Sequence, residues 1–496
     1  MNILIASSEV VPFAKTGGLA DVCGALPIEL ANLGETVYVF MPAFRQVRQS
    51  GQTIHDTGIR FEIPIGNRIV EGRLLQSTLP QSDVTVYLID QADYFDRAEL
   101  YRENGADYKD NCERFVFFSR AVLESIRLLD LSIDVVHVND WQTSLIPAYL
   151  KIEYANAPGF ENIGSLLTIH NMAYQGQFWH WDMLLTGIDW KFFNWHQMEY
   201  YGKLNLLKAG IVFADSINTV SPMYAQEIQS EPHGCGLEEV LQHRSKILSG
   251  IINGVDYDLW NPATDDLIAA KYSATDWQSN KPECKRQLQQ EFGLQDRSDA
   301  PIFGIVGRLA DQKGFDLVAE IIEHWAKKVD AQWAILGTGE PEYHALLARL
   351  AEQYSGKVAV KLEFSNRLAH IVEAGADMFV MPSRYEPCGL NQLYSLKYGT
   401  VPIVHKTGGL ADTIADANGE NLATGRANGF SFDDYSAAEL ENCLQRAYDT
   451  YRNDQNAWNQ IVVTGMNQDW SWNASAAQYV ELYELTMARA NQVVCA

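Results

Sequence analysis

Short runs of apolar residues alternate with helical periodicity through the first half of the chain. Their brevity and lack of polar positions predict strands buried on both faces of a sheet, at residues 3–6, 37–41, 84–89, 135–138 and 166–169. From Gly18 to Leu33, apolar residues recur at helical spacing, although Pro27 is expected to kink or split that helix. This alternation predicts an α/β fold with a parallel sheet.

The pattern is interrupted and then restarts in the second half. Residues 249–262, S-G-I-I-N-G-V-D-Y-D-L-W-N-P, are rich in turn formers and predict a crossing between two units. A helix is predicted from Phe315 to Val329, and strands at residues 302–306, 333–336, 378–381 and 402–405. A chain of 496 residues is too long for one compact core, so we expect two domains of similar size with a cleft between them.

One heptapeptide, K-T-G-G-L-A-D, occurs at Lys15–Asp21 and again at Lys406–Asp412. Each copy follows a predicted strand and opens a predicted helix. Gly-Gly is a common turn from strand to helix, so the repeat can arise without a shared function. The matching context favours two similar Rossmann-like halves.

Composition and charge exclude several classes of protein. Hydrophobic residues at 47% and charged residues at 20% are typical of a folded globular chain, and a net charge of -25 argues against a coat on nucleic acid or anionic membrane. A neutral polysaccharide partner meets no such objection. The N-terminus enters an apolar strand directly, without the pattern of a signal peptide, and no segment is long enough to span a bilayer.

The cysteines give neither a zinc motif nor a disulfide framework, because they are odd in number, scattered and without a C-x-x-C pair. We therefore expect a reducing, cytoplasmic compartment. The seven are Cys23, Cys112, Cys235, Cys284, Cys388, Cys443 and Cys495.

Two polar segments of the second half suit a phosphorylated sugar. In G-R-L-A-D-Q-K-G, Arg308 and Lys313 lie on a loop that enters a helix, where amides and the helix dipole also favour anions. In P-S-R-Y-E-P-C-G-L-N-Q-L, Glu386 precedes backbone amides at residues 389–391. The alternatives are a pair of solvated cations and a helix-capping carboxylate. The second heptapeptide adds an amide nest at Thr407, Gly408 and Gly409.

The first half places polar residues where predicted strands end, which is where ligands meet open α/β sheets. His170 and Asn171 follow one strand in T-I-H-N, and Asp140 follows another in N-D-W-Q. Taken alone, a histidine at a strand end is more often structural, and Asp140 is equally suited to cap a helix. The first glycine-rich turn completes the set with Lys15, Gly18 and Asp21.

These motifs, in this order and approximate spacing, resemble those of bacterial glycogen synthases and plant starch synthases over nearly the whole chain. The resemblance implies a GT-B fold, with two Rossmann-like domains facing a central cleft. It implies an N-terminal domain at 1–252, a nucleotide-sugar-binding domain at 253–476 and a C-terminal helix at 477–496 that returns to the first domain. The implied reaction is retaining transfer of glucose from ADP-glucose to the non-reducing end of an α-1,4-glucan, glycogen or starch.

The resemblance also implies roles for the matched residues. Arg308 and Lys313 would hold the pyrophosphate, and Glu386 would contact the donor glucose. His170 would lie beside the anomeric carbon, and Asp140 would position the acceptor or the donor sugar. The implied donor-binding set is Lys15, Gly18, Asp21, Asn171, Arg308, Lys313, Phe364 against the adenine, Cys388, Gly389, Leu390, Asn391, Thr407 and Gly408.

One position departs from many members of the family. Eight residues after Glu386, where many members have a second acidic residue, this chain has Tyr394, as starch-synthase-like sequences commonly do. Glu386 remains the candidate carboxylate, and Tyr394 has no general-acid role. We expect same-face attack guided by the leaving phosphate, with no metal ion or other cofactor. The expected partners are ADP-glucose and a glucan acceptor, without nucleic acid or membrane; the oligomeric state is not predicted.

Three other functions are less consistent with these motifs. A sucrose synthase, a trehalose-type synthase and a glycogen phosphorylase share the fold, but the motifs argue against each. A phosphorylase also needs a lysine that binds pyridoxal phosphate, and no lysine of this chain lies in that sequence setting. A catalytically silent glucan-binding protein has no reason to keep every charge around the donor. A dinucleotide-dependent oxidoreductase is weaker still, since neither glycine-rich turn reads G-x-G-x-x-G.

Overall fold

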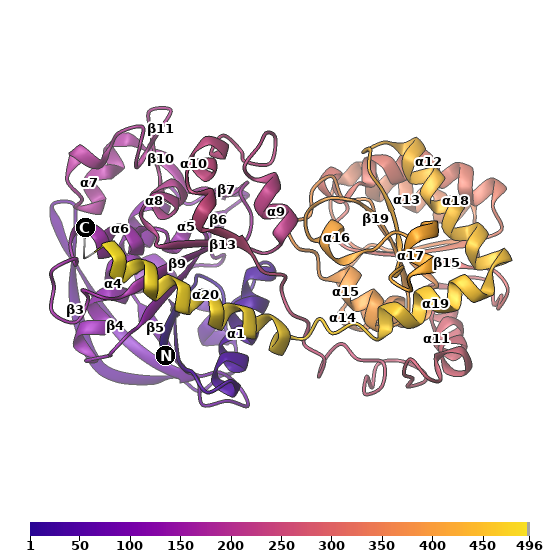
Figure 1. Ribbon diagram of the computed structural model, residues 1–496, viewed down its shortest axis with the longest axis horizontal. Helices are drawn as coiled ribbons and strands as arrows, with labels where there is room; N and C mark the ends of the chain where they lie inside the picture. The colour runs from indigo at the N-terminus through magenta and orange to yellow at the C-terminus, as the bar shows by residue number, and fades with distance from the viewer. Residues whose placement is uncertain (494–496) are drawn as a thin grey trace. The chain divides into compact units, whose positions relative to one another are not determined.

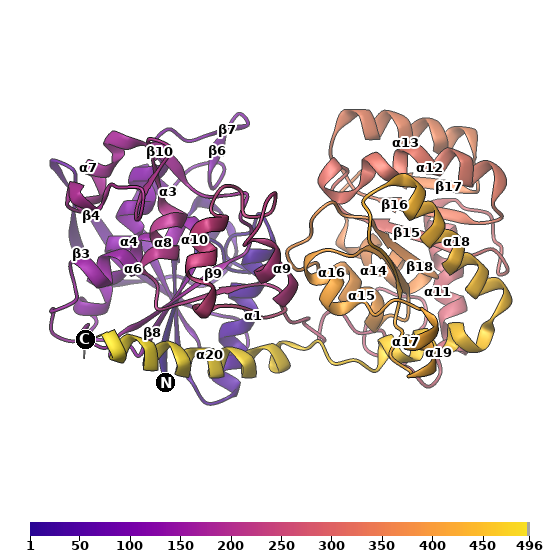
Figure 2. The same ribbon diagram turned by 45° about the horizontal axis from the view of Figure 1, so that its top comes forward.

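In the computed structural model, which describes residues 1–493, the chain forms two α/β units (Figures 1 and 2). Unit 1 comprises Met1–Gly254 and the C-terminal segment from Trp472, and unit 2 comprises Val255–Ser471. The chain thus leaves unit 1 after Gly254, where 252 was expected, and returns at Trp472, where 477 was expected. Cys495 lies outside the described residues.

Unit 1 is built on a nine-stranded sheet of order β14-β13-β9-β8-β1-β2-β5-β4-β3. Seven strands run parallel and include every strand predicted in this half: β1 (Asn2–Ala6), β2 (Thr36–Pro42), β5 (Thr85–Asp90), β8 (Val135–Asn139), β9 (Gly164–Ile169), β13 (Ser216–Thr219) and β14 (Leu248–Gly250). An antiparallel hairpin of β3 (His55–Ile65) and β4 (Arg68–Thr78) extends one edge. It was not predicted from continuous apolar runs, although its alternation of exposed and buried positions is the pattern of a strand with one solvent-exposed face.

Helices cover this sheet. The first, α1 (Gly18–Asn32), continues through Pro27 as one helix, so of the two predicted alternatives, a kink or a split, the split is excluded. The others of five residues or more are α2 (Arg45–Gln49), α4 (Asn111–Leu128), α6 (Leu145–Ile152), α8 (Leu206–Phe213), α9 (Pro222–Glu227), α10 (Glu238–His243) and α20 (Trp472–Val493). On α20, the Tyr483 hydroxyl lies 2.9 Å from His137 Nδ1 in the core of the sheet, so this last helix completes unit 1. No helix among residues 1–493 has the length and apolar composition that a membrane span needs.

Unit 2 has a six-stranded, wholly parallel sheet of order β17-β16-β15-β18-β19-β20. Its strands are β15 (Ile302–Val306), β16 (Gln332–Leu336), β17 (Val358–Lys361), β18 (Met378–Met381), β19 (Val401–His405) and β20 (Phe430–Phe432). The helices around it are α11 (Trp277–Phe292), α12 (Phe315–Lys328), α13 (Pro341–Gln353), α14 (Asn366–Gly375), α15 (Asn391–Lys397), α16 (Gly408–Thr413), α17 (Gly419–Ala423), α18 (Ala437–Asn453) and α19 (Gln455–Met466). The parallel order brings the carboxyl ends of all six strands to one edge.

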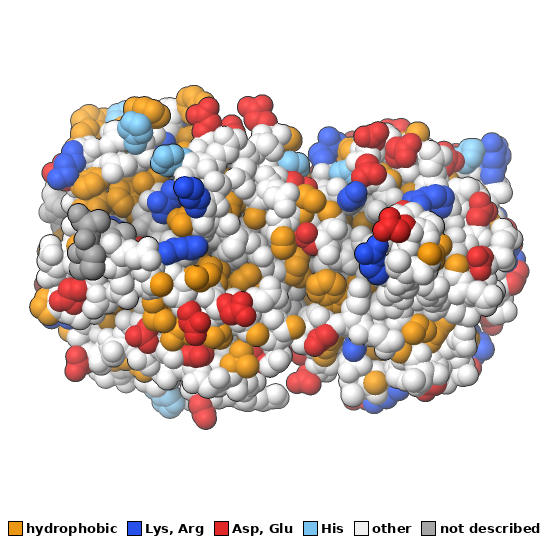
Figure 3. All heavy atoms as spheres, viewed as in Figure 1, with side chains coloured by type: hydrophobic (Ala, Val, Ile, Leu, Met, Phe, Trp, Pro, Cys, Tyr) orange, Lys and Arg blue, Asp and Glu red, His pale blue; other side chains and the backbone are white. Residues whose placement is uncertain are grey.

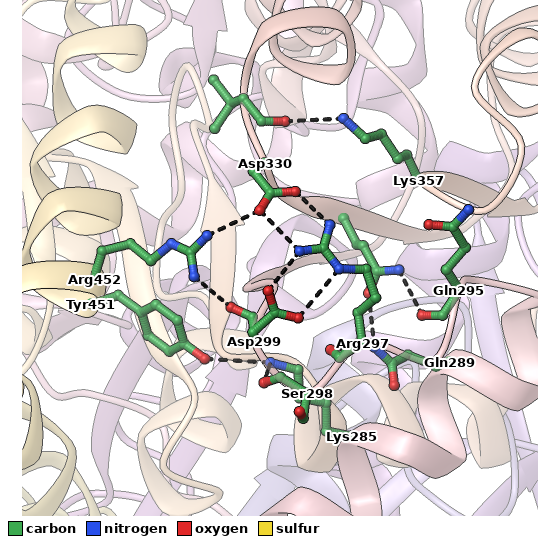
Figure 4. Close-up of polar contacts among 12 residues, drawn as sticks. Lys285, Gln289, Gln295, Arg297, Ser298, Asp299, Asp330, Lys357, Tyr451 and Arg452 are labelled. Carbon is green, nitrogen blue, oxygen red and sulfur yellow. Dashed lines mark hydrogen bonds and ion pairs between the residues drawn. The ribbon is translucent and has the colours of Figure 1, made fainter.

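A network of ion pairs joins elements at the opposite edge of unit 2, where the strands begin (Figure 4). Arg297 binds the carboxylates of Asp299 and Asp330, and Arg452 of α18 reaches Asp330 at 3.0 Å. A hollow of about 540 Å³ lies beside this network, with Trp277, Lys285, Tyr451 and Trp458 in its lining. Because it lies at the amino ends of the strands, it is separate from the edge that carries the predicted site residues.

Candidate active site

Two loops of unit 2 meet at an ion pair. Lys313 Nζ lies 2.6 Å from Glu386 Oε2, and the Ser383 hydroxyl donates to the same oxygen at 3.0 Å. Glu386 is buried, whereas Lys313 is partly exposed. Glu386 does not cap α15, whose N-cap is Leu390. The structure therefore brings a predicted phosphate ligand and the predicted sugar ligand together, from the loops after β15 and β18.

Glycine at position 314 permits this approach. Lys313 ends a short 3₁₀ turn (Asp311–Lys313), and Gly314 follows it at φ +79°. A Cβ on Gly314 would lie 2.1 Å from the carbonyl oxygen of Pro382, so no other residue fits without a shift of the backbone. The loop after β15 is thus packed directly on the loop after β18.

The second predicted cation, Arg308, is exposed at the same strand end. Its guanidinium donates to Gln312 Oε1, and the carbonyl oxygen of Gln312 accepts from the Arg384 N–H at 2.9 Å. Asn391 uses its side-chain amide to reach the carbonyl oxygen of Val306 at 2.8 Å, which ties the start of α15 to the end of β15. Arg308 and Lys313 therefore stand on one short loop beside a carboxylate.

The second K-T-G-G turn packs on the backbone of the Glu386 loop. The Gly409 N–H donates to the Glu386 carbonyl at 3.1 Å, and a Cβ on Gly409 would lie 2.0 Å from the carbonyl oxygen of Cys388. In the first copy of the heptapeptide, a Cβ on Gly17 or Gly18 would meet no heavy atom within 4 Å. In unit 2, packing against the Glu386 loop therefore requires glycine at position 409. In unit 1, the space around Gly17 and Gly18 is open, so packing does not require glycine there.

In unit 1, Asp140 occupies a strained position at the end of β8. It is a non-glycine residue at φ +55°, the first of the short helix α5 (Asp140–Thr143), and its Oδ1 accepts from the His170 N–H at 2.7 Å. Burial raises the pKa of Asp140 to about 7, and the nearby charge of Glu9 adds to the rise, against the hydrogen bonds from the backbone of His170 and Asn171. A carboxyl group that titrates near neutral pH at a strand end suits a functional role.

The His170 imidazole is neutral and has a defined tautomer. Asn139 donates its amide to the carbonyl oxygen of Ala6 at 3.2 Å, so its Oδ1 accepts the hydrogen bond from His170 Nε2 at 2.9 Å. The proton is then on Nε2, and Nδ1 keeps a lone pair. Burial lowers the pKa of His170 to about 3. His170 therefore acts near neutral pH as a neutral hydrogen-bonding group.

The loop that carries Lys15 rests on Glu9, a buried carboxylate that the sequence analysis missed. Glu9 accepts from the backbone and hydroxyl of Thr16, from the Gly17 N–H at 3.1 Å and from the Tyr101 hydroxyl at 2.8 Å. Lys15 itself is exposed and pairs with Asp21 at 2.6 Å. The position of Glu9, three residues after β1 ends, was a usable signal, because the other acidic and basic candidates also follow strand ends.

The two predicted aromatic positions have different surroundings. Phe364, in the loop after β17, is 91% exposed, so its ring face is open. Tyr394 stacks on Trp260 with ring centroids 4.0 Å apart, and His370 stacks on Trp260 at 3.8 Å. Tyr394 is thus part of an aromatic packing stack.

Among residues 1–493, one group of three or more His, Cys, Asp or Glu side chains is close enough to hold a metal ion. Asp311, Glu340 and Glu342 bring ligand atoms within 4.8 Å of one another, and the Tyr343 hydroxyl donates to Asp311. Surface carboxylates commonly gather in this way, and we assign them no ligand.

Comparisons with known proteins agree with this arrangement. The family model for the starch synthase catalytic domain matches residues 2–243, and that for glycosyl transferases group 1 matches residues 287–461. The chain is 46% identical to a glycogen synthase from Rhodopirellula baltica, over 98% of each chain, and 45% identical to one from Syntrophotalea carbinolica, over 97% of this chain and 98% of the other.

Solved structures give the fold. The catalytic domain of starch synthase IV from Arabidopsis thaliana, bound to ADP and acarbose, has a TM-score of 0.87 at 30% identity and covers 98% of this chain and 99% of its own. A sucrose-phosphate synthase from Thermosynechococcus elongatus, 17% identical with a TM-score of 0.57 over 98% of this chain and 99% of its own, shares the fold alone.

The two parallel-sheet units and their polar strand ends are those of a GT-B glycosyltransferase, as predicted. The chain belongs to the glycogen synthase and starch synthase family. The resemblance inferred from the motifs is confirmed, and the roles of the single residues remain predictions.

Proposed function

We propose that the protein is a glucan synthase that transfers glucose from ADP-glucose to the non-reducing end of an α-1,4-glucan, retains the anomeric configuration and releases ADP. The observation that carries the proposal is the Lys313–Glu386 pair beside Arg308 at the carboxyl edge of unit 2. A diphosphate leaving group needs cations, and a sugar needs a carboxylate acceptor next to them. Membership of the family supports the same assignment.

In this proposal unit 2 stabilises the leaving group. Lys313 has three N–H donors, so it can keep Glu386 in place while it binds a phosphate oxygen, and the exposed Arg308 adds a planar pair of donors. Glu386 accepts from a glucose hydroxyl. The amides at residues 389–391 would bind sugar hydroxyls. In the predicted amide nest of the second glycine-rich turn, the Thr407 N–H donates to the His405 carbonyl and the Gly409 N–H to the Glu386 carbonyl, so these two amides are not available to the distal phosphate that Thr407 and Gly408 were expected to bind. The two cations supply the charge compensation, so the proposed reaction needs no metal ion or other cofactor.

Unit 1 would act on the sugar during transfer. The bond from the anomeric carbon to the phosphate oxygen breaks as the acceptor hydroxyl attacks from the same face, and the hydroxyl proton passes to the departing phosphate. Neutral His170 would offer its backbone or its ring to the sugar hydroxyls without adding charge. Asp140 would supply a negative charge near the developing positive charge on the sugar.

The choice of base and the cellular location are part of the proposal. The open ring of Phe364 is available to stack on the base of the nucleotide. The choice of adenine, and so of ADP-glucose as the donor, rests on membership of the family. A cytoplasmic location rests on the scattered cysteines of the sequence.

The test is an assay of the purified chain with a glucan primer and either ADP-glucose or UDP-glucose. It follows release of the nucleoside diphosphate and growth of α-1,4-linked chains, with a primer-free reaction as control. We expect elongation with ADP-glucose and little with UDP-glucose. A preference for UDP-glucose would overturn the choice of donor, and no transfer from either would favour a silent glucan-binding protein.

A further inference from the structure

The imidazole of His405 joins two loops at the carboxyl edge of unit 2. His405 is the last residue of β19, which lies between β18 and β20 in the sheet. Its Nδ1 lies 2.8 Å from the carbonyl oxygen of Ser383, in the loop after β18. Its Nε2 lies 3.1 Å from the carbonyl oxygen of Asp433, directly after β20. The ring therefore bridges the loops that follow both neighbouring strands.

The two partners of this ring can only accept hydrogen bonds. A backbone carbonyl has lone pairs and no proton, so a ring nitrogen that bonds to it must carry the proton itself. A neutral imidazole has one N–H and one lone pair, and here that lone pair would point at the second carbonyl oxygen. Both contacts are satisfied together only by the imidazolium, in which both nitrogens of His405 are protonated.

Two other buried histidines have partners that suit a neutral ring. His137 lies between the hydroxyls of Tyr483 and Thr168, and each hydroxyl can donate or accept. His170 donates through Nε2 and keeps a lone pair on Nδ1. Burial lowers the pKa of both histidines to about 3. The pair of carbonyl partners thus distinguishes His405 from these two.

The ring of His405 has little contact with water. The residue is 8% exposed, and its ring packs on those of Phe432 and Tyr435, with centroids 5.4 and 5.3 Å away. Burial opposes a charge, and hydrogen bonds to the charged form offset that cost. Figure 3 shows Lys and Arg side chains interspersed with Asp and Glu over unit 2 on the face in view. The stabilisation of the imidazolium is therefore local and comes from its two carbonyl partners.

The charged side chains on the neighbouring elements are paired with one another. The ion pairs are Lys406–Asp433, Arg384–Asp316 and Lys313–Glu386. The Tyr435 hydroxyl donates to Asp316 at 2.6 Å. Within residues 1–493, neither ring nitrogen of His405 contacts a carboxylate. A change in the charge of His405 thus acts first on the two carbonyl contacts.

The bridge reaches the candidate site through Ser383. The hydroxyl of this serine donates to Glu386 Oε2, the oxygen that also contacts Lys313, while His405 holds its carbonyl oxygen. We infer that His405 is doubly protonated near neutral pH and is a positioning residue, which holds Ser383 and thereby Glu386 in the geometry that binds the donor. The inference rests on the proposed function, because it takes the nucleotide-sugar as the ligand of Glu386.

Nitrogen NMR of the full chain with isotope-labelled histidine measures the charge. The His405 signals are those that disappear in His405→Arg. At neutral pH both ring nitrogens of His405 should give the signals of a protonated imidazolium, whereas His170 should show one protonated and one unprotonated nitrogen. A neutral His405 ring would overturn the inference.

Calorimetry with ADP-glucose, in the absence of a glucan, measures the positioning role. In His405→Gln the side chain is neutral and donates from one nitrogen only, so binding should weaken about tenfold. In His405→Arg a cation with several donors can reach both carbonyls, so binding should stay within about threefold of the wild type. Raising the pH until the imidazolium loses its proton should weaken binding by the wild type but not by His405→Arg.

His324→Gln is the matched control, since His324 is an exposed histidine of the same unit that pairs with Glu441. It should bind ADP-glucose as the wild type does. Unchanged binding by His405→Gln would contradict the positioning role, as would a loss in His405→Arg or in the control equal to that in His405→Gln. Neither measurement needs turnover, so a protein that gives the expected results but transfers no glucose would refute the proposed function alone.

Discussion

The ammonium of Lys313 lies 2.6 Å from the carboxylate of Glu386, although 73 positions separate the two residues in the chain. One follows β15 and the other follows β18, adjacent parallel strands of unit 2. The pair is a structural contact and, in the proposed function, also the point where phosphate and sugar are bound. Its two roles can be separated by substitution.

Lys313→Ala and Arg308→Ala should both lose turnover but differ in stability. Each removes positive charge from the leaving group, so kcat should fall roughly 10²–10³-fold. Lys313→Ala also leaves the buried Glu386 carboxylate without its cation, which should cost about 1–3 kcal/mol of unfolding free energy. Arg308 is exposed, and its loss should change stability by less than about 0.5 kcal/mol. Steady-state kinetics and urea unfolding measure the two effects.

The double variant Lys313→Ala with Glu386→Gln serves as the control for this pair. It removes the unpaired charge, so stability should recover while turnover stays low. Near-normal turnover in a folded Lys313→Ala or Arg308→Ala protein would show that these residues do not bind the leaving group.

The two copies of the heptapeptide should respond in opposite ways to the same substitution. Gly409→Ala places a Cβ against the Cys388 carbonyl, which should cost about 1–3 kcal/mol and displace the Glu386 loop. Gly18→Ala meets no atom, and as the first residue of α1 it should keep or slightly raise the melting temperature. Its turnover should nevertheless fall, since the donor is expected to approach this backbone. Equal melting temperatures for the two variants would refute the packing argument.

The pH dependence of kcat/KM should report Asp140. Its pKa of about 7 means that the carboxylate forms as pH rises through 7, so the rate should rise over the same interval. Asp140→Asn should give a low rate without this rise. In His170→Asn the backbone hydrogen bond to Asp140 is kept and the rise should persist, because His170, with a pKa of about 3, stays neutral throughout. A rise that disappears in His170→Asn would assign the titration to the imidazole instead.

Glu373 should make stability depend on pH. Burial raises the pKa of Glu373 to about 8, against the opposing effects of the Ser395 hydroxyl and Lys281. Between about pH 5 and 8 the unfolded chain loses this proton while the folded chain keeps it, so stability falls as pH rises, by at most about 1.4 kcal/mol per pH unit. Glu373→Gln should remove this part of the slope.

Urea unfolding of the wild type and Glu373→Gln at several pH values measures the difference, in which the titrations that are not coupled to Glu373 cancel. Lys281 is coupled to it, because burial lowers the pKa of Lys281 and the charge of Glu373 acts to raise it. Glu363→Gln, at an exposed position of the same unit, is the control and should leave the slope unchanged. Parallel curves for the wild type and Glu373→Gln would contradict the buried titration.

The sequence predicted the central strands well because their positions are apolar on both faces. Strands such as Ile302–Val306 and Met378–Met381 have the predicted bounds. The β3–β4 hairpin was missed because it contains no continuous apolar run, although the alternation of Phe61, Ile63 and Ile65 with polar or exposed positions is the signal of a half-exposed strand. The continuity of α1 through Pro27 was also not predicted. Helix propensity is a local property of the sequence, and it does not include the burial of Leu26 and Leu30 in the fold.

At the site, strand ends identified Lys313, Glu386, Asp140 and His170, since position after a strand is a local signal. Their contacts were not predictable, because they depend on how distant loops pack. Glu9 illustrates the limit: its carboxylate is visible in the sequence, but its four hydrogen-bonding groups on Thr16, Gly17 and Tyr101 appear only in the fold.

The most direct measurement compares glucan elongation from ADP-glucose by the wild type, Arg308→Ala and His170→Ala, at equal folded concentration. The wild type should release ADP in step with the growth of α-1,4-linked chains, and each variant should be slower by about 10²-fold or more. A wild type that transfers no glucose, or variants that elongate at the wild-type rate, would contradict the account.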